Sequence, residues 1–156
     1  NYLPKISRTI RIPSSMMMAS WMGSHFTNDD LVKESRLVED YNIETTYEGP
    51  RDGEEIWEFR LTPVPEAVVV WGGIDFIVRK KDLMPIKADY FDEDNTLKRT
   101  VYYSDYRRMG GRLVPAEMKL VPSDEPDEYT KITYTELEFN MEHPPDTFSL
   151  SSLRDR

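Results

Sequence analysis

The sequence contains no cysteine among its 156 residues, which excludes disulfides, thiolate nucleophiles and cysteine-based metal sites. Only two histidines are present, and neither His25 nor His143 stands at a spacing from a serine or carboxylate that indicates a catalytic triad. A chain of this length buries roughly 68–70% of its unfolded surface, so it needs no disulfide or metal to fold. We therefore expect one domain over residues 1–156. The absence of cysteine fits any cellular compartment, so it does not locate the protein.

The sequence also lacks a run of about 18 apolar residues, so we expect no membrane-spanning helix. Basic residues are in deficit, with 20 Lys and Arg against 29 Asp and Glu and a net charge of −9. This balance argues against a nucleic-acid partner and against simple electrostatic docking on anionic lipid. No signal peptide is recognisable and the first residue is Asn1, so we expect a mature or trimmed form of the protein.

Apolar side chains are concentrated in a segment from Met16 to Phe26, which we call the Met-rich loop. It holds four of the eight methionines together with Trp21 and Phe26. Because these residues do not alternate with a period of two, the segment is predicted to be a loop rather than a strand. Methionine is flexible and polarisable, which suits irregular or changing surfaces. Two interpretations stay open: the loop caps the end of a core, or it acts as a lid over a ligand.

A helix-start signal follows the Met-rich loop. Thr27 can accept a hydrogen bond from the amide of Asp30, whose carboxylate can accept one in return, as in a capping box. Asp29 and Asp30 also suit the positive end of a helix dipole. The pattern predicts a short helix from Asn28 to about Glu34.

Most of the remaining chain alternates between apolar and polar residues, which predicts roughly eight strands. The expected strands span residues 5–12, 41–48, 57–62, 74–79, 85–91, 97–106, 112–121 and 129–140. Turn residues separate neighbouring strands, so we expect an antiparallel meander. The phase slips near Thr135 and Glu136, which predicts a β-bulge there. The apolar residues 67–71 fit either a buried strand or a helical turn. Near the end of the chain, a short tail is expected to be anchored by Phe148, Leu150 and Leu153.

Motifs for catalysis or cofactor binding are missing. The turn at Asp92 and Asp94 lacks the glycine and the distal glutamate of a calcium loop. The glycine pairs at residues 72–73 and 110–111 lack the lysine and the helix entry of a phosphate-binding loop. Helix capping explains Asp29 and Asp30 without acid–base catalysis. We therefore predict no enzyme, no catalytic residue, no metal ligand and no cofactor, but a mostly β binding module.

Several motifs give the sequence a family resemblance. They are Tyr2-Leu3-Pro4 with a basic strand through Arg11, the segment Trp21–Leu31, Met84–Lys87, Gly110–Pro115, and Asp146–Leu150 followed by Leu153. In these motifs the chain resembles the LolA-like outer-membrane lipoprotein-sorting proteins, in particular the branch found beside RND-type exporters. His25 stands where that family usually has aspartate. The family's N-terminal portion has no counterpart here, so we expect the chain to be the C-terminal two-thirds of a LolA-like domain.

The resemblance implies a mostly β (α+β) fold in which a curved antiparallel sheet forms an unclosed β-barrel with one or two short helices, LolA/LppX-like. It implies a periplasmic carrier that binds the acyl chains of a lipid or lipoprotein for transfer to the outer membrane. An RND-type exporter or an outer-membrane acceptor is the implied protein partner. A sheet without its first strands leaves an edge open, so self-association is also expected.

A carrier of this kind needs an apolar wall and a movable cover, and both are predicted from apolar residues of the strands and of the Met-rich region. The candidate lipid-binding residues are Met16, Met17, Met18, Trp21, Met22, Phe26, Leu31, Trp57, Phe59, Leu61, Phe76, Tyr103 and Met118. The alternative is a structural or protein-interaction module of an envelope transport complex, in which the Met-rich loop contacts another protein. A hydrolase is disfavoured because a nucleophile–base set is missing.

Overall fold

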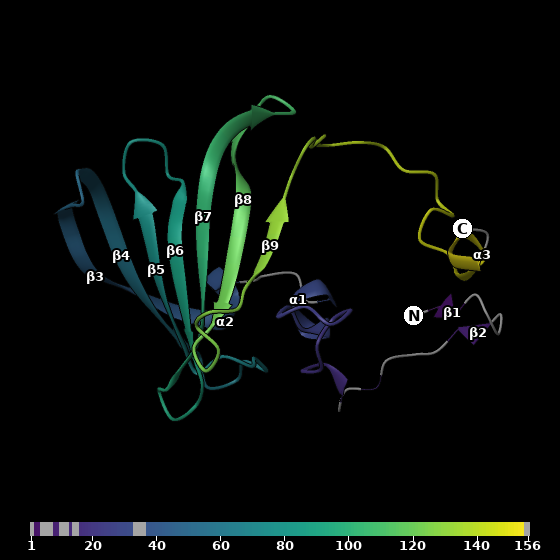
Figure 1. Ribbon diagram of the computed structural model, residues 1–156, viewed down its shortest axis with the longest axis horizontal. Coiled ribbons are helices and arrows are strands. Elements are labelled where there is room, and N and C mark those ends of the chain that lie inside the picture. Colours follow the sequence, from purple (N-terminus) through teal and green to yellow (C-terminus); the bar gives the residue numbers. More distant parts are fainter. Residues whose placement is uncertain (1, 4–7, 10–12, 14–15, 33–36, 155–156) are drawn as a thin grey trace.

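The computed structural model describes residues 2–3, 8–9, 13, 16–32 and 37–154 (Figure 1). Its main element is a seven-stranded antiparallel sheet with the order β3-β4-β5-β6-β7-β8-β9. These strands are β3 (Tyr41–Arg51), β4 (Glu54–Pro63), β5 (Gly73–Arg79), β6 (Pro85–Phe91), β7 (Leu97–Met109), β8 (Arg112–Pro122) and β9 (Thr130–Thr133). The other elements are β1 (Tyr2–Leu3), β2 (Arg8–Thr9), α1 (Asn28–Val32), α2 (Leu37–Asp40) and α3 (Leu150–Arg154).

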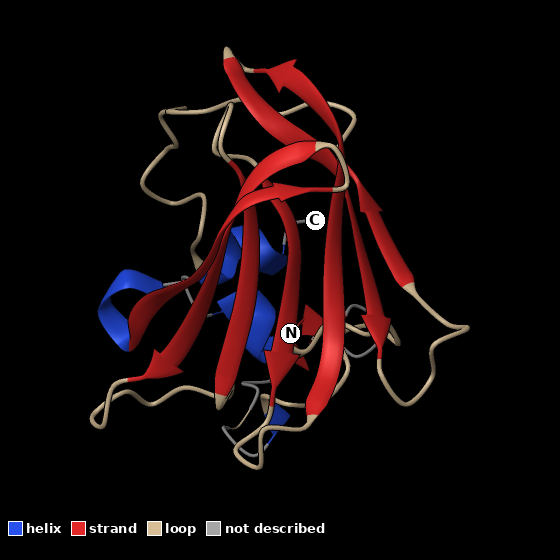
Figure 2. Cartoon of the chain, turned by 90° about the vertical axis from the view of Figure 1, so that its left-hand side faces the viewer, coloured by secondary structure: helices blue, strands red, loops and turns tan. Residues whose placement is uncertain are grey.

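Each strand of the large sheet pairs with its sequence neighbour, which confirms the predicted antiparallel meander. Within the described part of the chain, β3 and β9 are the two edges, so the sheet does not close into a barrel. The strands are twisted, and α1 and α2 lie on one side of the sheet (Figure 2). The predicted fold class, a curved antiparallel sheet with few short helices, is confirmed.

The two faces of the sheet differ in polarity because alternate residues point to opposite sides. The face toward α1 and α2, which we call the inner face, carries buried apolar residues that are aligned across the strands: Leu61, Ile74, Ala88, Val101 and Leu120. The outer face carries polar pairs such as Arg60–Asp75 at 3.0 Å and Lys131–Glu117 at 2.9 Å. A one-residue register shift would exchange the two faces, so this polarity fixes the strand pairing.

The last strand is shorter than predicted. β9 ends at Thr133, and the expected bulge near residues 135–136 is wrong because the strand does not reach that position. After the hydrogen bond from Tyr134 N to Ala116 O, the chain turns to the tip of the β7–β8 hairpin. There the Phe139 ring lies 4.6 Å from the Arg112 guanidinium, and a Cβ on Gly110 would come within 2.7 Å of Leu137 O. Leu137 and Phe139, whose positions broke the alternation pattern, thus lie at the hairpin tip and do not extend the sheet.

The predicted capping box is present at the start of α1. Thr27 N donates to Asp30 Oδ2 at 2.8 Å, and Asp30 N donates to Thr27 Oγ1 at 3.3 Å. The Met-rich loop folds back on the helix start, since Asn28 Nδ2 donates to Met16 O at 3.1 Å and to Ala19 O at 3.3 Å. Residues 16–32 therefore form one compact unit, which we call the lid.

Three other predictions have different outcomes. The expected strand over residues 5–12 includes β2, and its other residues lie outside the described part of the chain. Residues 67–71 are neither strand nor helix. The predicted anchoring of the tail is wrong for Phe148 and Leu150, which are 87% and 62% exposed. None of the described helices is long and apolar enough to span a membrane.

Candidate ligand cavity

A cavity of about 420 Å³ lies between the inner face of the sheet, the lid and α2. Its lining residues come from α1 and its flanks, α2, the irregular segment 69–71 and strands β3, β5, β6, β7 and β8: Phe26, Asp29, Asp30, Leu37, Asp40, Tyr41, Val69, Val70, Trp71, Ile74, Phe76, Tyr90, Arg99, Val101, Tyr103 and Met118. Pockets for small ligands span roughly 300–1,000 Å³ and are mostly apolar with a few polar groups. The cavity fits this description in both size and lining.

Aromatic rings form much of the wall. Trp71 and Tyr90 meet edge to face with ring centroids 5.2 Å apart, and Phe76 and Tyr103 do so at 6.5 Å. Such contacts stabilise each ring in one orientation in addition to the apolar area that they bury. The wall is therefore built from aromatic rings of the sheet and of segment 69–71, and Phe26, Asp29 and Asp30 of the lid cover it.

The charged centre of the cavity is the pair Arg99–Asp30, which joins β7 to α1. Arg99 Nη1 and Nη2 each donate to one oxygen of Asp30 at 2.7 Å, a bidentate arrangement. The guanidinium also lies 4.4 Å from the Trp71 ring centroid and 4.6 Å from that of Tyr90. Arg99 Nε is buried and has no hydrogen-bond partner among the described residues. Arg99 therefore holds one buried, unpaired donor behind the cavity wall.

Burial and charge determine the ionisation of these groups. For Asp30, burial raises the pKa, but the hydrogen bonds and charge of Arg99 and the contacts with Thr27 outweigh it, so the pKa is lowered from its usual 3.8. Burial raises the pKa of Tyr90 and Tyr103, and it raises the pKa of Tyr41 to about 12. The tyrosines stay neutral at physiological pH, so a ligand in the cavity meets uncharged hydroxyls, the Asp30–Arg99 ion pair and the carboxyl side chains of Asp29 and Asp40.

The predicted wall residues all lie on the inner face, but they divide into two groups. Phe76, Tyr103 and Met118 line the cavity. Phe59 and Leu61 pack in the apolar core beside it. Trp57 pairs with Val78 farther along the sheet, where the Lys80 ammonium lies 5.5 Å from its ring centroid. Alternation thus grouped these residues on one face of the sheet, while the tertiary structure decided that this face is the inner one and which of the residues reach the cavity.

The predicted lid residues are placed differently. Only Phe26 among them lines the cavity. Four others are exposed at the surface, Met16 by 52%, Met18 by 49%, Met22 by 84% and Leu31 by 52%. Met17 and Trp21 are half-buried in the lid itself. The lid therefore covers the cavity with Phe26 and α1, and it presents most of its methionines to solvent.

Sequence reasoning missed Arg99, Tyr90 and Trp71. Arg99 lies on the same side of the predicted strand as Leu97, Val101 and Tyr103. A charged residue among apolar ones on one face of a strand is unusual, and this could have identified Arg99 from the sequence. Trp71 lies in the apolar segment 67–71, for which the sequence left both a buried strand and a helical turn open. Its role depends on contacts with residues far along the chain, which no local pattern shows.

Comparison with known proteins places the chain in a family. A family model described as "-like: Uncharacterized protein" matches residues 1–155. The chain belongs to this family. No curated protein matches the chain significantly.

Solved structures give the fold relationship. The chain is similar to a DUF1329 family protein from Desulfovibrio piger, with 26% identity and a TM-score of 0.86 over 97% of this chain and 62% of that one. It is similar to a putative outer-membrane lipoprotein-sorting protein domain from Vibrio parahaemolyticus, with 19% identity and a TM-score of 0.81 over 98% and 64%. A LolA superfamily protein from Nitrosomonas europaea shows 17% identity and a TM-score of 0.74 over 97% and 66%. The chain thus spans just under two thirds of the length of each relative, and it has the fold expected from the LolA-like resemblance.

Proposed function

We propose that the protein is a non-catalytic carrier that binds an acyl chain of a lipid or lipoprotein in the cavity under the lid. The observation that carries this proposal is the combination of a 420 Å³ cavity, a largely aromatic and aliphatic wall and a cover joined to the sheet by one ion pair. The fold that the chain shares with a lipoprotein-sorting domain and a LolA superfamily protein supports it.

The energetics of such binding match the cavity. Each methylene group that leaves water contributes about 0.8 kcal/mol, so one long acyl chain contributes on the order of 10 kcal/mol before ordering costs. This contribution needs apolar contact and few hydrogen bonds. The unpaired Nε–H of Arg99 supplies one donor for a carboxylate or ester oxygen at the end of the chain.

Entry of a ligand requires movement of the lid, because α1 and Phe26 line the cavity. The Asp30 carboxylate is the polar link between α1 and the sheet, so its release from Arg99 opens the cover in this proposal. A ligand oxygen that accepts from Arg99 competes with Asp30 for the same cation. Ligand binding and lid opening are thereby coupled through one guanidinium.

Filling the cavity tests the proposal. Met118 lines the cavity, so Met118→Trp places a larger side chain in the space and is expected to weaken binding of a fluorescent fatty acid at least about tenfold. Lys119→Trp is the matched control, because Lys119 is the adjacent residue of β8 and is exposed on the outer face. Binding is measured by fluorescence titration after circular dichroism has shown that both variants are folded. Equal affinity of Met118→Trp and the unmodified protein rules out this cavity as the binding site.

The cellular setting belongs to the same proposal. By the family resemblance, the carrier works in the periplasm and delivers its cargo to an outer-membrane acceptor, with an RND-type exporter as a further partner. Extraction of the purified protein with organic solvent, followed by mass spectrometry, identifies a retained lipid. Recovery of the protein from the cytoplasmic fraction of its native cells contradicts the periplasmic location.

A second candidate function is that of a protein-interaction module, because the exposed methionines of the lid favour it. Met16, Met18 and Met22 are about half or more exposed, and methionine is common at adaptable binding surfaces. Native mass spectrometry after gentle purification separates the two functions: retained lipid supports the carrier, and a lipid-free protein with a specific partner supports the module. In the second case, replacing the three methionines with serine removes the partner.

A further inference from the structure

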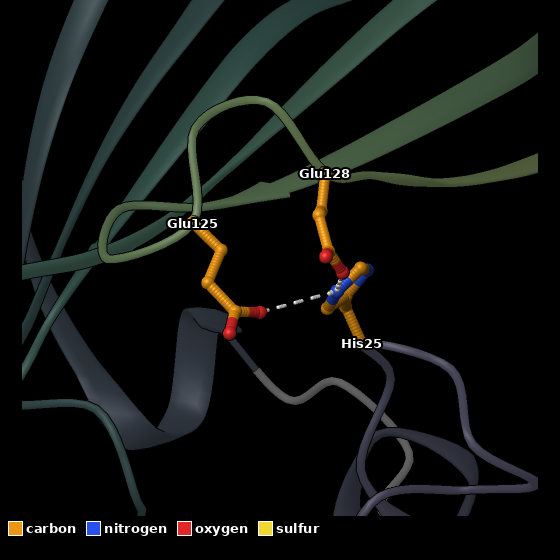
Figure 3. Close-up of side chains that lie close together, drawn as sticks. All are labelled: His25, Glu125 and Glu128. Atoms are coloured by element: carbon orange, nitrogen blue, oxygen red, sulfur yellow. Dashed lines mark ion pairs between the residues drawn. The ribbon is translucent and has the colours of Figure 1, made fainter.

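A cluster of metal-ligating side chains lies outside the cavity, where the lid meets the loop between β8 and β9. His25 belongs to the Met-rich loop, and Glu125 and Glu128 belong to the β8–β9 loop (Figure 3). His25 Nε2 lies 3.7 Å from Glu128 Oε2 and 4.0 Å from Glu125 Oε2. All three possible ligand atoms lie within 4.8 Å of one another. The fold thus gathers one imidazole and two carboxylates from segments far apart in the chain.

The imidazole is held in a fixed orientation by β9. His25 N donates to Thr130 Oγ1 at 3.0 Å, and His25 Nδ1 lies 2.9 Å from the same oxygen. A hydroxyl oxygen has two lone pairs, so Thr130 can accept both hydrogen bonds. In the tautomer that carries the proton on Nδ1, the lone pair of Nε2 faces the two carboxylates. Metal-binding histidines show this arrangement, in which the second ring nitrogen is fixed by a neighbouring group.

The charge of the surroundings favours a cation. Residues 123–128 contain four acidic residues and no basic residue. Within the part of the chain that the structure describes, neither Glu125 nor Glu128 forms an ion pair with a lysine or arginine, and His25 is their only ion-pair partner. Two carboxylates beside a neutral imidazole carry two negative charges, which a divalent cation compensates.

The ligand types and distances select the kind of cation. Zinc bonds to histidine nitrogen and carboxylate oxygen are about 2.0–2.2 Å long, so neighbouring ligand atoms of a tetrahedral site lie roughly 3.3–3.5 Å apart. The separations of 3.7 and 4.0 Å between His25 Nε2 and the two carboxylates exceed this by roughly 0.2–0.7 Å. Both glutamates are exposed, by 59% and 67% of their side chains, and can rotate to close the difference. A mixed nitrogen and oxygen set favours zinc over calcium or magnesium, which prefer oxygen alone.

We infer that His25, Glu125 and Glu128 form a binding site for a divalent transition-metal ion of the zinc type. The three residues supply one nitrogen and two oxygen ligands, and water completes the tetrahedron. A bound ion connects the Met-rich loop to the β8–β9 loop and thereby ties the lid to the sheet at a second point. This site does not depend on the proposed lipid binding.

Zinc titration of the metal-free protein tests the inference. After dialysis against a chelator, zinc chloride is titrated in competition with a chromophoric zinc indicator, and one equivalent is expected to bind. The double variant Glu125→Gln, Glu128→Gln keeps the side-chain size and is expected to bind zinc at least about tenfold more weakly, as is His25→Ala. Zinc is expected to raise the melting temperature of the unmodified protein but not of these variants. Calcium is expected to bind more weakly than zinc.

The second histidine provides the matched control. His143 lies outside the cluster, and its ring packs edge to face against Phe148 with centroids 5.6 Å apart. His143→Ala is expected to bind zinc like the unmodified protein. An affinity that is unchanged in the double glutamine variant overturns the inference, because zinc then binds at residues other than Glu125 and Glu128. A protein that binds no zinc, or a loss of binding in His143→Ala, overturns it equally.

Discussion

The lid is attached to the sheet at two polar contacts that differ in burial. At α1, Asp30 forms a bidentate pair with Arg99, and their side chains are 19% and 8% exposed. At the Met-rich loop, His25 faces Glu125 and Glu128, whose side chains are 59% and 67% exposed. Water screens the second contact and hardly reaches the first. The first contact therefore controls stability, while the second responds to charge and to bound ions.

The difference also bears on the proposed carrier, which needs both a stable fold and a cover that can move. A buried ion pair often adds little net stability compared with apolar packing, but removal of one partner leaves a costly unpaired charge. Arg99 avoids part of this cost because it stacks on Trp71 and Tyr90. In the proposed open state, the cation still lies over the two aromatic rings and not in a fully apolar space.

The largest expected effect comes from breaking the buried contact. Asp30→Ala leaves the Arg99 cation buried without its partner and is expected to lower the free energy of unfolding by about 3 kcal/mol. Asp75→Ala is the control on the outer face, since Asp75 forms a single 3.0 Å contact with Arg60 and a partly exposed pair contributes less than about 1 kcal/mol. Urea unfolding followed by circular dichroism measures both. Equal losses in the two variants contradict the distinction between the contacts.

Lowering the pH is also expected to weaken the buried Asp30–Arg99 contact, by protonating the carboxylate. The folded-state pKa of Asp30 is lowered below its ordinary value of 3.8, so its contribution to stability is present above pH 3.8 and is lost as the pH falls through the folded-state pKa. The stability difference between the unmodified protein and Asp30→Ala therefore shrinks below about pH 4. Urea unfolding at a series of pH values between neutral and pH 2 measures this. A difference that stays constant over the whole range shows that the ionised carboxylate is not responsible.

The smallest effect is expected at the exposed contact in the absence of metal. With a chelator present, His25→Ala removes the side-chain contacts with Thr130 and the two glutamates but keeps the backbone hydrogen bond to Thr130, and it is expected to lower the free energy of unfolding by about 1 kcal/mol or less. Thermal and urea unfolding give this value. If His25→Ala lowers the free energy of unfolding as much as Asp30→Ala does, the two contacts contribute equally to stability and the distinction between them is wrong.

Local patterns in the sequence predicted a large part of the fold. The alternation in β3 to β8 predicted the strands and their order, because a half-buried strand alternates with a period of two, but it left open which face is the inner one. Thr27 and Asp30 gave the start of α1, because a capping box needs only residues three apart. The prediction failed at residues 134–140, where apolar side chains pack on the β7–β8 hairpin tip and no further strand forms. The LolA-like fold expected from the motifs was correct as well.

The sequence by itself determined the meander and the cap of α1, since each depends on neighbouring residues. Only the tertiary structure decided which side chains line the cavity and how the lid is attached. Asp30 and Arg99 are 69 residues apart in the chain, and His25 and Thr130 are 105 apart. Contacts at such separations depend on how the strands twist and where the loops cross them, and a pattern read over a few residues contains neither.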